Sequence, residues 1–458
     1  MFVPARKAAL LSILGGNLFL PATGIAIAGF PNYTKLIAAG LGALLVACFF
    51  AFPKLISWRP KLLDIFFLGF LAAPPISSML NGLGPYDAAS SFVNRFLEWG
   101  IAYWVGRSLF TDLESLRDIC VGVVVSAVAY APLCLYEIVM SPQLNRMIYG
   151  FRPSSWAMTK RFGGWRPTVF MQHGLALAAW IAAAALVAWI LWRSKAIRNI
   201  CGIPIFWIAI TLAVLTIMLR STGAALLLVG LIAVVEIIQA TRVRPLLLVL
   251  ILAPMVYIGL RTTGWEGQQL VHMAEMIDQE RADSLSIRLE NDQLIVDKAM
   301  NNRPFFGWGG WGRWRVRDQW GNDITISDSW WGILVGTTGA FGLVCTYATF
   351  ISPLFPLALH KTRRRIFEGA SGAAWALGFG VLLFVLDTLA NAMPNTSFML
   401  MAATLVSVYP LVSPKAMNRM MSKQQSQTPP TAQDRQNPLP HDANNARSAY
   451  RTTSADRI

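Results

Sequence analysis

The stretch GLALAAWIAAAALVAWILW (174–192) contains no charged residue and is almost entirely apolar. A helix needs about 20 such residues to cross the hydrocarbon core of a bilayer, which is about 30 Å thick. Lipid offers the backbone no hydrogen-bond partners, so a run of this kind must satisfy its amides and carbonyls internally, as a helix. The stretch therefore predicts a membrane-spanning helix.

Runs of the same kind recur along most of the chain. The 458 residues are 55% hydrophobic and only 14% charged, whereas about 25% of the residues in an average soluble protein are charged. We therefore predict an all-α membrane protein with about twelve transmembrane helices. The predicted spans lie near residues 8–29, 36–53, 62–81, 91–109, 119–140, 168–192, 201–219, 222–241, 245–260, 328–356, 371–390 and 396–413.

The basic residues of the chain lie mostly between these apolar runs. A net charge of +15 would suggest a nucleic-acid partner in a soluble protein, but here the basic residues gather in short loops, where the positive-inside rule explains them. With twelve spans every cluster falls on one side, which predicts that this side and both termini are cytoplasmic. The clusters are Arg6/Lys7, Lys54/Arg59/Lys61, Arg193/Lys195/Arg198, Arg242/Arg244, Lys361/Arg363/Arg364/Arg365 and Lys415/Arg419/Lys423.

The chain divides into a membrane domain, residues 1–413, and a tail, residues 414–458. The tail is rich in Gln, Asn, Pro, Ser and Arg and almost lacks large apolar residues, a composition that predicts a disordered cytoplasmic segment. The five cysteines all lie in apolar runs without paired spacing, which is typical of small core residues rather than disulfides or metal ligands.

An outward-facing loop near residues 141–167 carries five basic residues on the side where they are normally scarce. Guanidinium groups grip phosphate oxygens in pairs, so one interpretation is an anionic ligand at the outer leaflet. The other is simple contact with lipid headgroups, and both stay open. The five residues are Arg146, Arg152, Lys160, Arg161 and Arg166.

The longest loop, near residues 261–327, lies between the ninth and tenth predicted spans, on the periplasmic side. Within SLSIRLENDQLIVDKAMNN (284–302), one helical stripe collects Leu285, Leu289, Val296 and Met300, while Arg281 and Arg288 share another face. The pattern predicts an amphipathic helix on the outer membrane surface that presents arginine toward the protein.

A glycine- and tryptophan-rich segment, PFFGWGGWGRWRVRD (304–318), follows this helix. Its glycines permit a tight backbone path, and Trp308, Trp311 and Trp314 offer flat apolar faces. The tryptophans fit two interpretations equally, stacking on sugar rings or anchoring at the membrane interface.

Charged and polar residues also fall inside predicted spans. Arg95 and Glu98 lie three apart in the fourth span, and Asp387 begins a polar stripe with Asn391 and Asn395 in the eleventh. Charges at membrane depth are costly, so they indicate either function or a structural pair.

Four stretches, in this order and on these sides of the membrane, resemble the O-antigen ligase / polysaccharide polymerase superfamily. The first resembles the family's arginine and polar corner before the sixth span, and the second the motif that opens the eighth. The third resembles its loop arginine, helix and proline-to-glycine turn, and the fourth its His-Asn stretch. They are RPTVFMQHGLALAAW (166–180), RSTGAALLLVGL (220–231), RLENDQLIVDKAMNNRPFFGWG (288–309) and SDSWWGILVGTTGAFGL (327–343).

The resemblance implies glycosyl transfer at the periplasmic face of the bacterial inner membrane, without metal or cofactor. A glycan would move from an undecaprenyl-pyrophosphate carrier to a glycan or lipid acceptor, in polymerisation or ligation of O-antigen or exopolysaccharide, alongside polysaccharide assembly proteins. Arg166 and Arg288 would contact the pyrophosphate. The remaining candidate substrate contacts are His173, Arg220, Arg281, Trp308 and Trp311. The chain itself offers no Asp-x-Asp pair and no histidine cluster for a divalent ion.

The chain departs from the family at two positions. Asp328-Ser329 stands where the family has His-Asn, so Asp328 would replace the histidine as general base. Thr222 stands where an arginine is expected, with Arg220 two residues earlier. These departures suggest a divergent, exopolysaccharide-type enzyme, and they leave open a non-catalytic assembly subunit. A transporter or flippase of lipid-linked sugars is a further alternative, although the halves of the chain show no similarity to each other.

Overall fold

The computed structural model describes residues 3–243, 245–276, 278–325, 327–359 and 370–408. The chain separates into two units, Met1–Ser413 and Pro414–Ile458, and all described residues belong to the first. The predicted tail, residues 414–458, lies outside the described residues, as do Arg244 and the cluster at 361–365.

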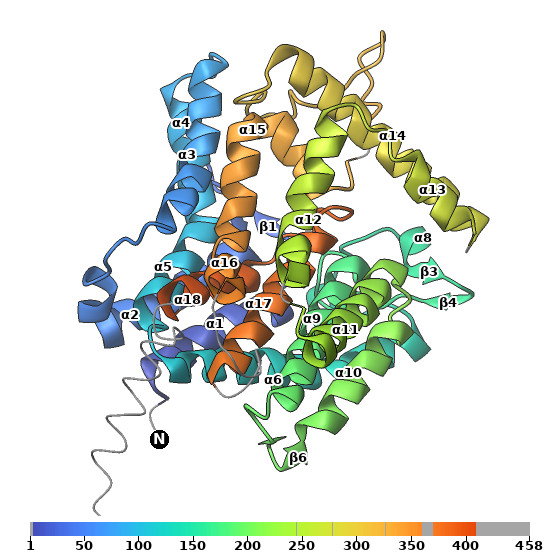
Figure 1. Cartoon of the computed structure of the whole chain (residues 1–458). Coiled ribbons are helices and arrows are strands. Elements are labelled where there is room, and N and C mark those ends of the chain that lie inside the picture. Colours follow the sequence, from blue (N-terminus) through green and yellow to red (C-terminus); the bar gives the residue numbers. More distant parts are fainter. Residues whose placement is uncertain (1–2, 244, 277, 326, 360–369, 409–458) are drawn as a thin grey trace, which may run out of the picture. The chain divides into compact units, whose positions relative to one another are not determined.

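Helices make up most of the described chain (Figure 1). Those within the predicted spans are α1 (Ala5–Phe19), α2 (Lys35–Ile56), α3 (Asp64–Leu80), α4 (Pro85–Arg95), the π-helix η1 (Phe96–Gly100), α5 (Ile101–Leu109), α6 (Leu113–Met140), α9 (Gly174–Arg193), α10 (Ile205–Met218), α11 (Thr222–Thr241), α12 (Pro245–Thr262), α15 (Trp330–Ile351), α17 (Ala370–Asp387) and α18 (Thr396–Val408).

The described connections hold four short helices, the 24-residue helix α14 and three two-stranded hairpins. The helices are α7 (Leu144–Tyr149), α8 (Trp156–Thr159), α13 (Gln268–Glu275), α14 (Gln279–Asn302) and α16 (Leu354–Ala358). The antiparallel hairpins pair β1 (Gly24–Ile25) with β2 (Tyr33–Thr34), β3 (Lys160–Arg161) with β4 (Gly164–Trp165), and β5 (Asn199–Ile200) with β6 (Ile203–Pro204).

Six helices among the described residues are long and apolar enough to cross a membrane, namely α2, α6, α9, α11, α12 and α15. Shorter apolar helices are α3, α10, α17 and α18. Large apolar side chains also point outward, such as Phe49 (79% exposed) and Phe50 (73%) on α2, which a soluble protein would bury. The predicted class, an all-α membrane protein, is thereby confirmed.

The first predicted span, 8–29, is wrong at its end. Helix α1 stops at Phe19, and the following residues form the β1–β2 hairpin. Pro21 has no amide hydrogen to continue the helical ladder, and it disfavours helical geometry at Leu20, whose ψ is 151°.

Helix α9, which contains the stretch that predicted the fold, lies at the centre of the packing. It contacts α10, α17, α11 and α6, and Ala182, Ala183 and Ala184 are fully buried. Small side chains allow neighbouring helices to approach closely, which is how helices associate in membranes without a hydrophobic driving force between them. An all-apolar helix with no polar face is therefore suited to this central position.

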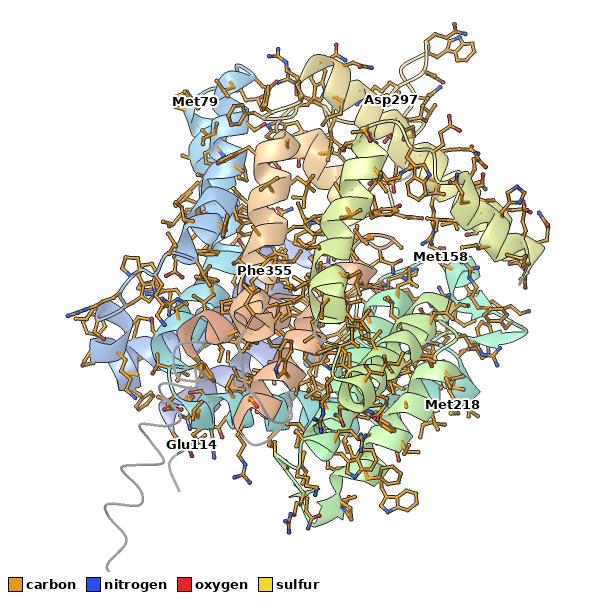
Figure 2. All side chains as sticks on the ribbon, viewed as in Figure 1. Met79, Glu114, Met158, Met218, Asp297 and Phe355 are labelled. Atoms are coloured by element: carbon orange, nitrogen blue, oxygen red, sulfur yellow. The ribbon has the colours of Figure 1, made fainter. Side chains whose placement is uncertain are left out.

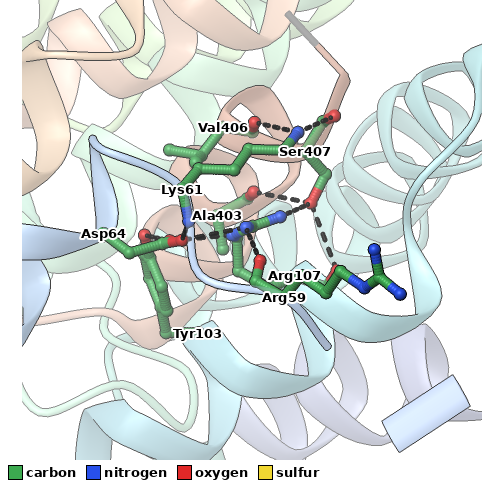
Figure 3. A network of polar contacts seen from close by, with 8 residues as sticks. All are labelled: Arg59, Lys61, Asp64, Tyr103, Arg107, Ala403, Val406 and Ser407. Carbon is green, nitrogen blue, oxygen red and sulfur yellow. Dashed lines mark hydrogen bonds and ion pairs between the residues drawn. The ribbon is translucent and has the colours of Figure 1, made fainter. Parts of the chain in front are cut away.

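A buried polar network ties α3, α5 and α18 together (Figure 3). The Arg107 guanidinium grips the Asp64 carboxylate with Nε–Oδ1 at 2.8 Å and Nη2–Oδ2 at 2.9 Å, and Tyr103 donates to the same carboxylate at 2.6 Å. Lys61 closes the end of α18 by donating to the carbonyls of Val406 and Ser407. Every charge here has partners, so we interpret the network as structural.

The glycine-rich segment after α14 lies along α15. Trp308 and Gly309 donate from their backbone amides to the carbonyls of Gly336 and Thr337, both at 2.9 Å. Gly339 interrupts α15 with a φ of 62°, and a Cβ there would lie 2.5 Å from the Phe305 carbonyl carbon. Only glycine allows this approach, and it anchors the long loop to the helical body.

Candidate functional site

The site begins on α14, which confirms the amphipathic helix predicted over 284–302. Leu289 and Val296 of the predicted stripe are buried, together with Ile295 and Ala299. Arg288 lies on the same side of the helix as buried Asp292 and Ile295, four and seven residues later. Its side chain is nevertheless 30% exposed, which leaves the guanidinium available for polar contacts. The side chain of Arg281 lies outside the described residues.

Arg288 contacts Asp328, the residue predicted as its catalytic partner. The Arg288 Nε lies 3.1 Å from Asp328 Oδ2, and the two side chains are 30% and 41% exposed. A second guanidinium nitrogen donates to the Ala390 carbonyl at 3.3 Å. Arg288 therefore joins α14, the residues before α15 and the residues after α17 at one accessible point.

Asp292, which the sequence analysis did not select, lies one helical turn after Arg288. Its carboxylate is buried and accepts a 2.6 Å hydrogen bond from the Ser329 hydroxyl. Ser329 in turn caps α15 by accepting from the Gly332 amide. The i,i+4 spacing from Arg288 was the available signal, because it puts both residues on one helical face.

The pKa of Asp292 is raised to about 6, mainly because burial penalises its charged form. The neighbouring Asp328 carboxylate acts in the same direction. The Ser329 hydrogen bond and the positive charges of Arg261 and Arg288 oppose the shift. Two carboxylates thus share one region of positive charge.

His173 lies close enough to Arg288 and Asp328 for both charges to act on its pKa. This pKa is lowered to about 4, mainly by burial and then by the Arg166 charge, while Asp328 opposes the shift. The imidazole is therefore neutral at pH 7. Its Nδ1 accepts from the Leu175 amide at 3.1 Å as the N-cap of α9, so the ring proton sits on Nε2.

Arg166 is a buried positive charge close enough to His173 to act on its pKa. Its side chain is only 5% exposed, packs against Gly174, and donates from one nitrogen to the Arg220 carbonyl at 3.1 Å. Glu137 holds the adjacent chain by accepting from the amides of Thr168 and Val169, both at 2.8 Å. The arginine is thus held in place, but it does not present an open fork to solvent.

Arg220 has a different place from the one predicted as a ligand contact. Its guanidinium donates to the carbonyl of Arg161 at 2.8 Å and to that of Phe162, and it fills the space beside Gly164. These contacts clamp the β3–β4 hairpin. Among the described residues, no contact joins Arg220 to the Arg288–Asp328 pair.

The three tryptophans of the glycine-rich segment differ in exposure. Trp314 is buried against Gly336, and Trp308 is half-buried with the cations of Lys298 and Arg303 over its ring, 5.2 and 5.8 Å from the centroid. Trp311 is 78% exposed. Only Trp311 therefore offers an open indole face.

Of the described polar residues predicted at membrane depth, Asp387 and Asn391 are in contact, whereas Arg95 and Glu98 do not pair. Arg95 lies over the Phe70 ring at 4.8 Å, and among the described residues it makes no ion pair with Glu98, which belongs to the π-helix η1. Helix α17 ends at Asp387, so Asn391 lies beyond the helix and donates back to the Asp387 carboxylate at 2.7 Å.

No group of three or more histidine, cysteine, aspartate or glutamate residues in the described part of the chain is arranged to hold a metal ion. Neither a protein-family model nor a curated protein matches the sequence.

Proposed function

We propose that this protein transfers a glycan from a polyprenyl-pyrophosphate carrier to an acceptor hydroxyl at the outer face of the bacterial inner membrane. The observation that carries the proposal is the accessible pair of Arg288 and Asp328, 3.1 Å apart, with His173 within electrostatic reach. Residues from α14, from the N-terminus of α15 and from the N-terminus of α9 thereby meet beside apolar helices that can hold a lipid-linked substrate.

In this mechanism the pair separates when the donor binds. Arg288 exchanges the Asp328 carboxylate for the pyrophosphate, because a guanidinium matches two phosphate oxygens as well as it matches a carboxylate. The exchange frees Asp328 to accept a hydrogen bond from the acceptor hydroxyl. The ion pair thus holds both groups in position until the substrate arrives.

The transfer step forms one bond to the anomeric carbon and breaks another. The acceptor oxygen bonds to the anomeric carbon, and its proton passes to the Asp328 carboxylate. The bond from the anomeric carbon to the phosphate oxygen breaks, and its electron pair leaves with the pyrophosphate. Arg288 stabilises the growing negative charge directly, and the buried Arg166 does so at longer range, where low polarity strengthens the interaction.

Two neighbours position this chemistry. Neutral His173 can donate from Nε2 to a substrate oxygen, while its Nδ1 stays on α9. Asp292 holds Ser329, the residue next to Asp328 in the chain, at 2.6 Å. Fixing the backbone at Ser329 fixes the reach of the Asp328 side chain.

Substitutions of the pair test the proposal. Loss of one charge-assisted contact made in the transition state costs about 100-fold to 1,000-fold in rate, so Arg288→Ala and Asp328→Asn should each fall into this range. Arg288→Lys should be nearly as slow as Arg288→Ala, because an ammonium lacks the bidentate fork. Asp328→His should keep part of the activity, since imidazole also accepts a proton.

The measurement is glycan transferred from polyprenyl-pyrophosphate donor by protein in proteoliposomes, per unit of protein that elutes as a single gel-filtration peak. Arg317→Ala and Asp297→Asn are the matched controls, because both residues are exposed and lie away from the pair. Wild-type transfer by both Arg288→Ala and Asp328→Asn would reject the mechanism.

A further inference from the structure

Trp311 has the backbone conformation least expected for its side chain. Its φ is 62°, in the left-handed region where a bulky residue is an outlier and costs about 1–3 kcal/mol. Seven other non-glycine residues share a positive φ, but Trp311, at 78%, is the most exposed large apolar residue among them. A strained backbone conformation persists only where the surroundings impose it. The surroundings therefore fix the backbone at Trp311, although its indole is exposed.

The surroundings of Trp311 show how it is held. The indole Nε1 donates to the Asp87 carboxylate at 3.3 Å, in the first turn of α4. Two residues later, the Arg313 guanidinium donates to the Asn81 carbonyl at 3.1 Å and Lys298 donates to the Arg313 carbonyl at 2.9 Å. The loop is thus fixed to α3, α4 and α14 around the tryptophan.

The face of this indole stays open. Nothing lies within 4 Å of the position where a Cβ on neighbouring Gly310 would stand, and no ring or cation of the described residues covers Trp311. Its polar edge is occupied by Asp87, whose carboxylate can also accept hydrogen bonds from a ligand. An apolar face beside a carboxylate matches a pyranose ring, which has a C–H face and hydroxyl groups around its rim.

We propose that Trp311 and Asp87 form a binding platform for a pyranose ring of a glycan. A membrane-interface anchor needs no strained backbone and no fixed orientation. A preorganised aromatic face, by contrast, gives affinity because little freedom is lost on binding.

The position of the platform adds a statement about the substrate, which rests on the proposed function. Lys298, which holds the Trp311 loop, lies ten residues along α14 from Arg288, or about 15 Å at the helical rise per residue. A sugar on Trp311 is therefore not the one at the reacting carbon. The substrate that uses both places is an oligosaccharide or polymer rather than a single sugar unit.

Binding is measured without transfer. The purified full chain in lipid nanodiscs is titrated against fluorescent hexasaccharides of glucose, galactose and N-acetylglucosamine, and Kd is read from anisotropy. At least one should bind, with Trp311→Ala raising its Kd about tenfold, which corresponds to about 1.4 kcal/mol. Trp311→Phe should lose less, since it keeps an aromatic face, and Asp87→Ala should fall between them, since it releases the indole.

Trp320 provides the matched control, because it is equally exposed (77%) but its indole has no partner among the described residues. Trp320→Ala should leave Kd unchanged. Equal effects of Trp311→Ala and Trp320→Ala, or no binding of any hexasaccharide to the wild type, would overturn the platform.

The membrane alternative is read separately. The fluorescence of Trp311 is taken as the difference between the wild type and Trp311→Phe in nanodiscs of brominated lipid. Bromine would strongly quench this fluorescence if Trp311 were an interface anchor. That outcome would also overturn the platform. The failure of the binding platform can be distinguished from the failure of the proposed transfer reaction. Hexasaccharide binding that needs Trp311, in a protein without transfer activity, would reject only the proposed function.

Discussion

The charge state of Asp292 should affect the stability of the folded protein between about pH 4 and pH 6. Its pKa is raised from an ordinary value of 3.8 to about 6 by burial, so between these values the folded state binds more protons than the unfolded state. Stability should therefore fall as pH rises from about 4 to 6, with the penalty fully present above pH 6. Four neighbours modify the shift: Asp328 raises the pKa further, while Ser329, Arg261 and Arg288 lower it.

We predict that Asp292→Asn raises the thermal midpoint in detergent at pH 7 and has little effect at pH 4.5. The amide can still accept from Ser329 but carries no charge to bury. Thermal unfolding of wild type and variant across pH 4–7 measures this. Asp297→Asn, on the exposed side of α14, should show no such trend. A midpoint lowered equally at both pH values would mean that the ionised carboxylate is the stabilising form.

At the scale of elements, the closest approach between α15 and the loop after α14 is made by two glycines. Gly339 and Gly307 pack backbone against backbone, and a Cβ on Gly339 would lie 2.6 Å from the Gly307 amide nitrogen. Gly339 also has a φ of 62°. An alanine would face both strain and overlap, and the loop must separate from α15 to relieve the overlap.

Gly339→Ala should therefore loosen residues 303–318 without unfolding the helices. The backbone conformation of Gly339, with φ 62° and ψ −163°, is essentially restricted to glycine and costs another residue about 1–3 kcal/mol, which raises the open population by about tenfold. Limited trypsin digestion at Arg303 and Arg315 should be correspondingly faster, with the gel-filtration profile unchanged. Gly223→Ala, where a Cβ meets nothing within 4 Å, serves as the control. Unchanged cleavage would show that α15 can absorb the side chain.

At the scale of the whole molecule, the predicted sidedness can be compared with the two ends of the helical body. In Figure 2, Met79 at the end of α3 and Asp297 on α14 lie at the upper end, and Glu114 at the start of α6 lies at the lower end. The twelve-span proposal assigns the first two to the outer face and the third to the cytoplasm. Arg6, paired with Glu114 at 3.1 Å, then places the N-terminus inside.

Cysteine labelling tests this orientation. Cys201 is exposed in the β5–β6 turn, which the proposal places in the cytoplasm. In a Cys48→Ser background, an impermeant thiol reagent applied to intact spheroplasts should spare Cys201 and label a cysteine introduced at exposed Glu290 on α14. Permeabilised cells should label both. Labelling of Cys201 alone in intact cells would invert the topology.

The sequence alone could predict the membrane class, most helices and the amphipathic helix, since these depend on local runs and periodicity. The hydrophobic pattern could not predict where α1 ends. The apolar run continues beyond Pro21, but the helix ends before it. For the same reason Asp387, Asn391 and Asn395 read as one stripe, while the helix ends at Asp387.

The candidate site divides in the same way. The family resemblance pointed to Arg288, Asp328 and Arg166, and the place of His173 near Arg166 added a fourth candidate. Basic residues in an outward-facing loop are unusual from the sequence alone. Only the tertiary structure shows which arginine side chain is accessible to a ligand and which is already occupied by contacts within the protein. Arg220 clamps a hairpin, Arg166 is buried, and Asp292 joins the site. These outcomes depend on which backbone carbonyls and carboxylates the packing brings within 3 Å of each side chain, and contacts between residues far apart in sequence leave no trace in local pattern.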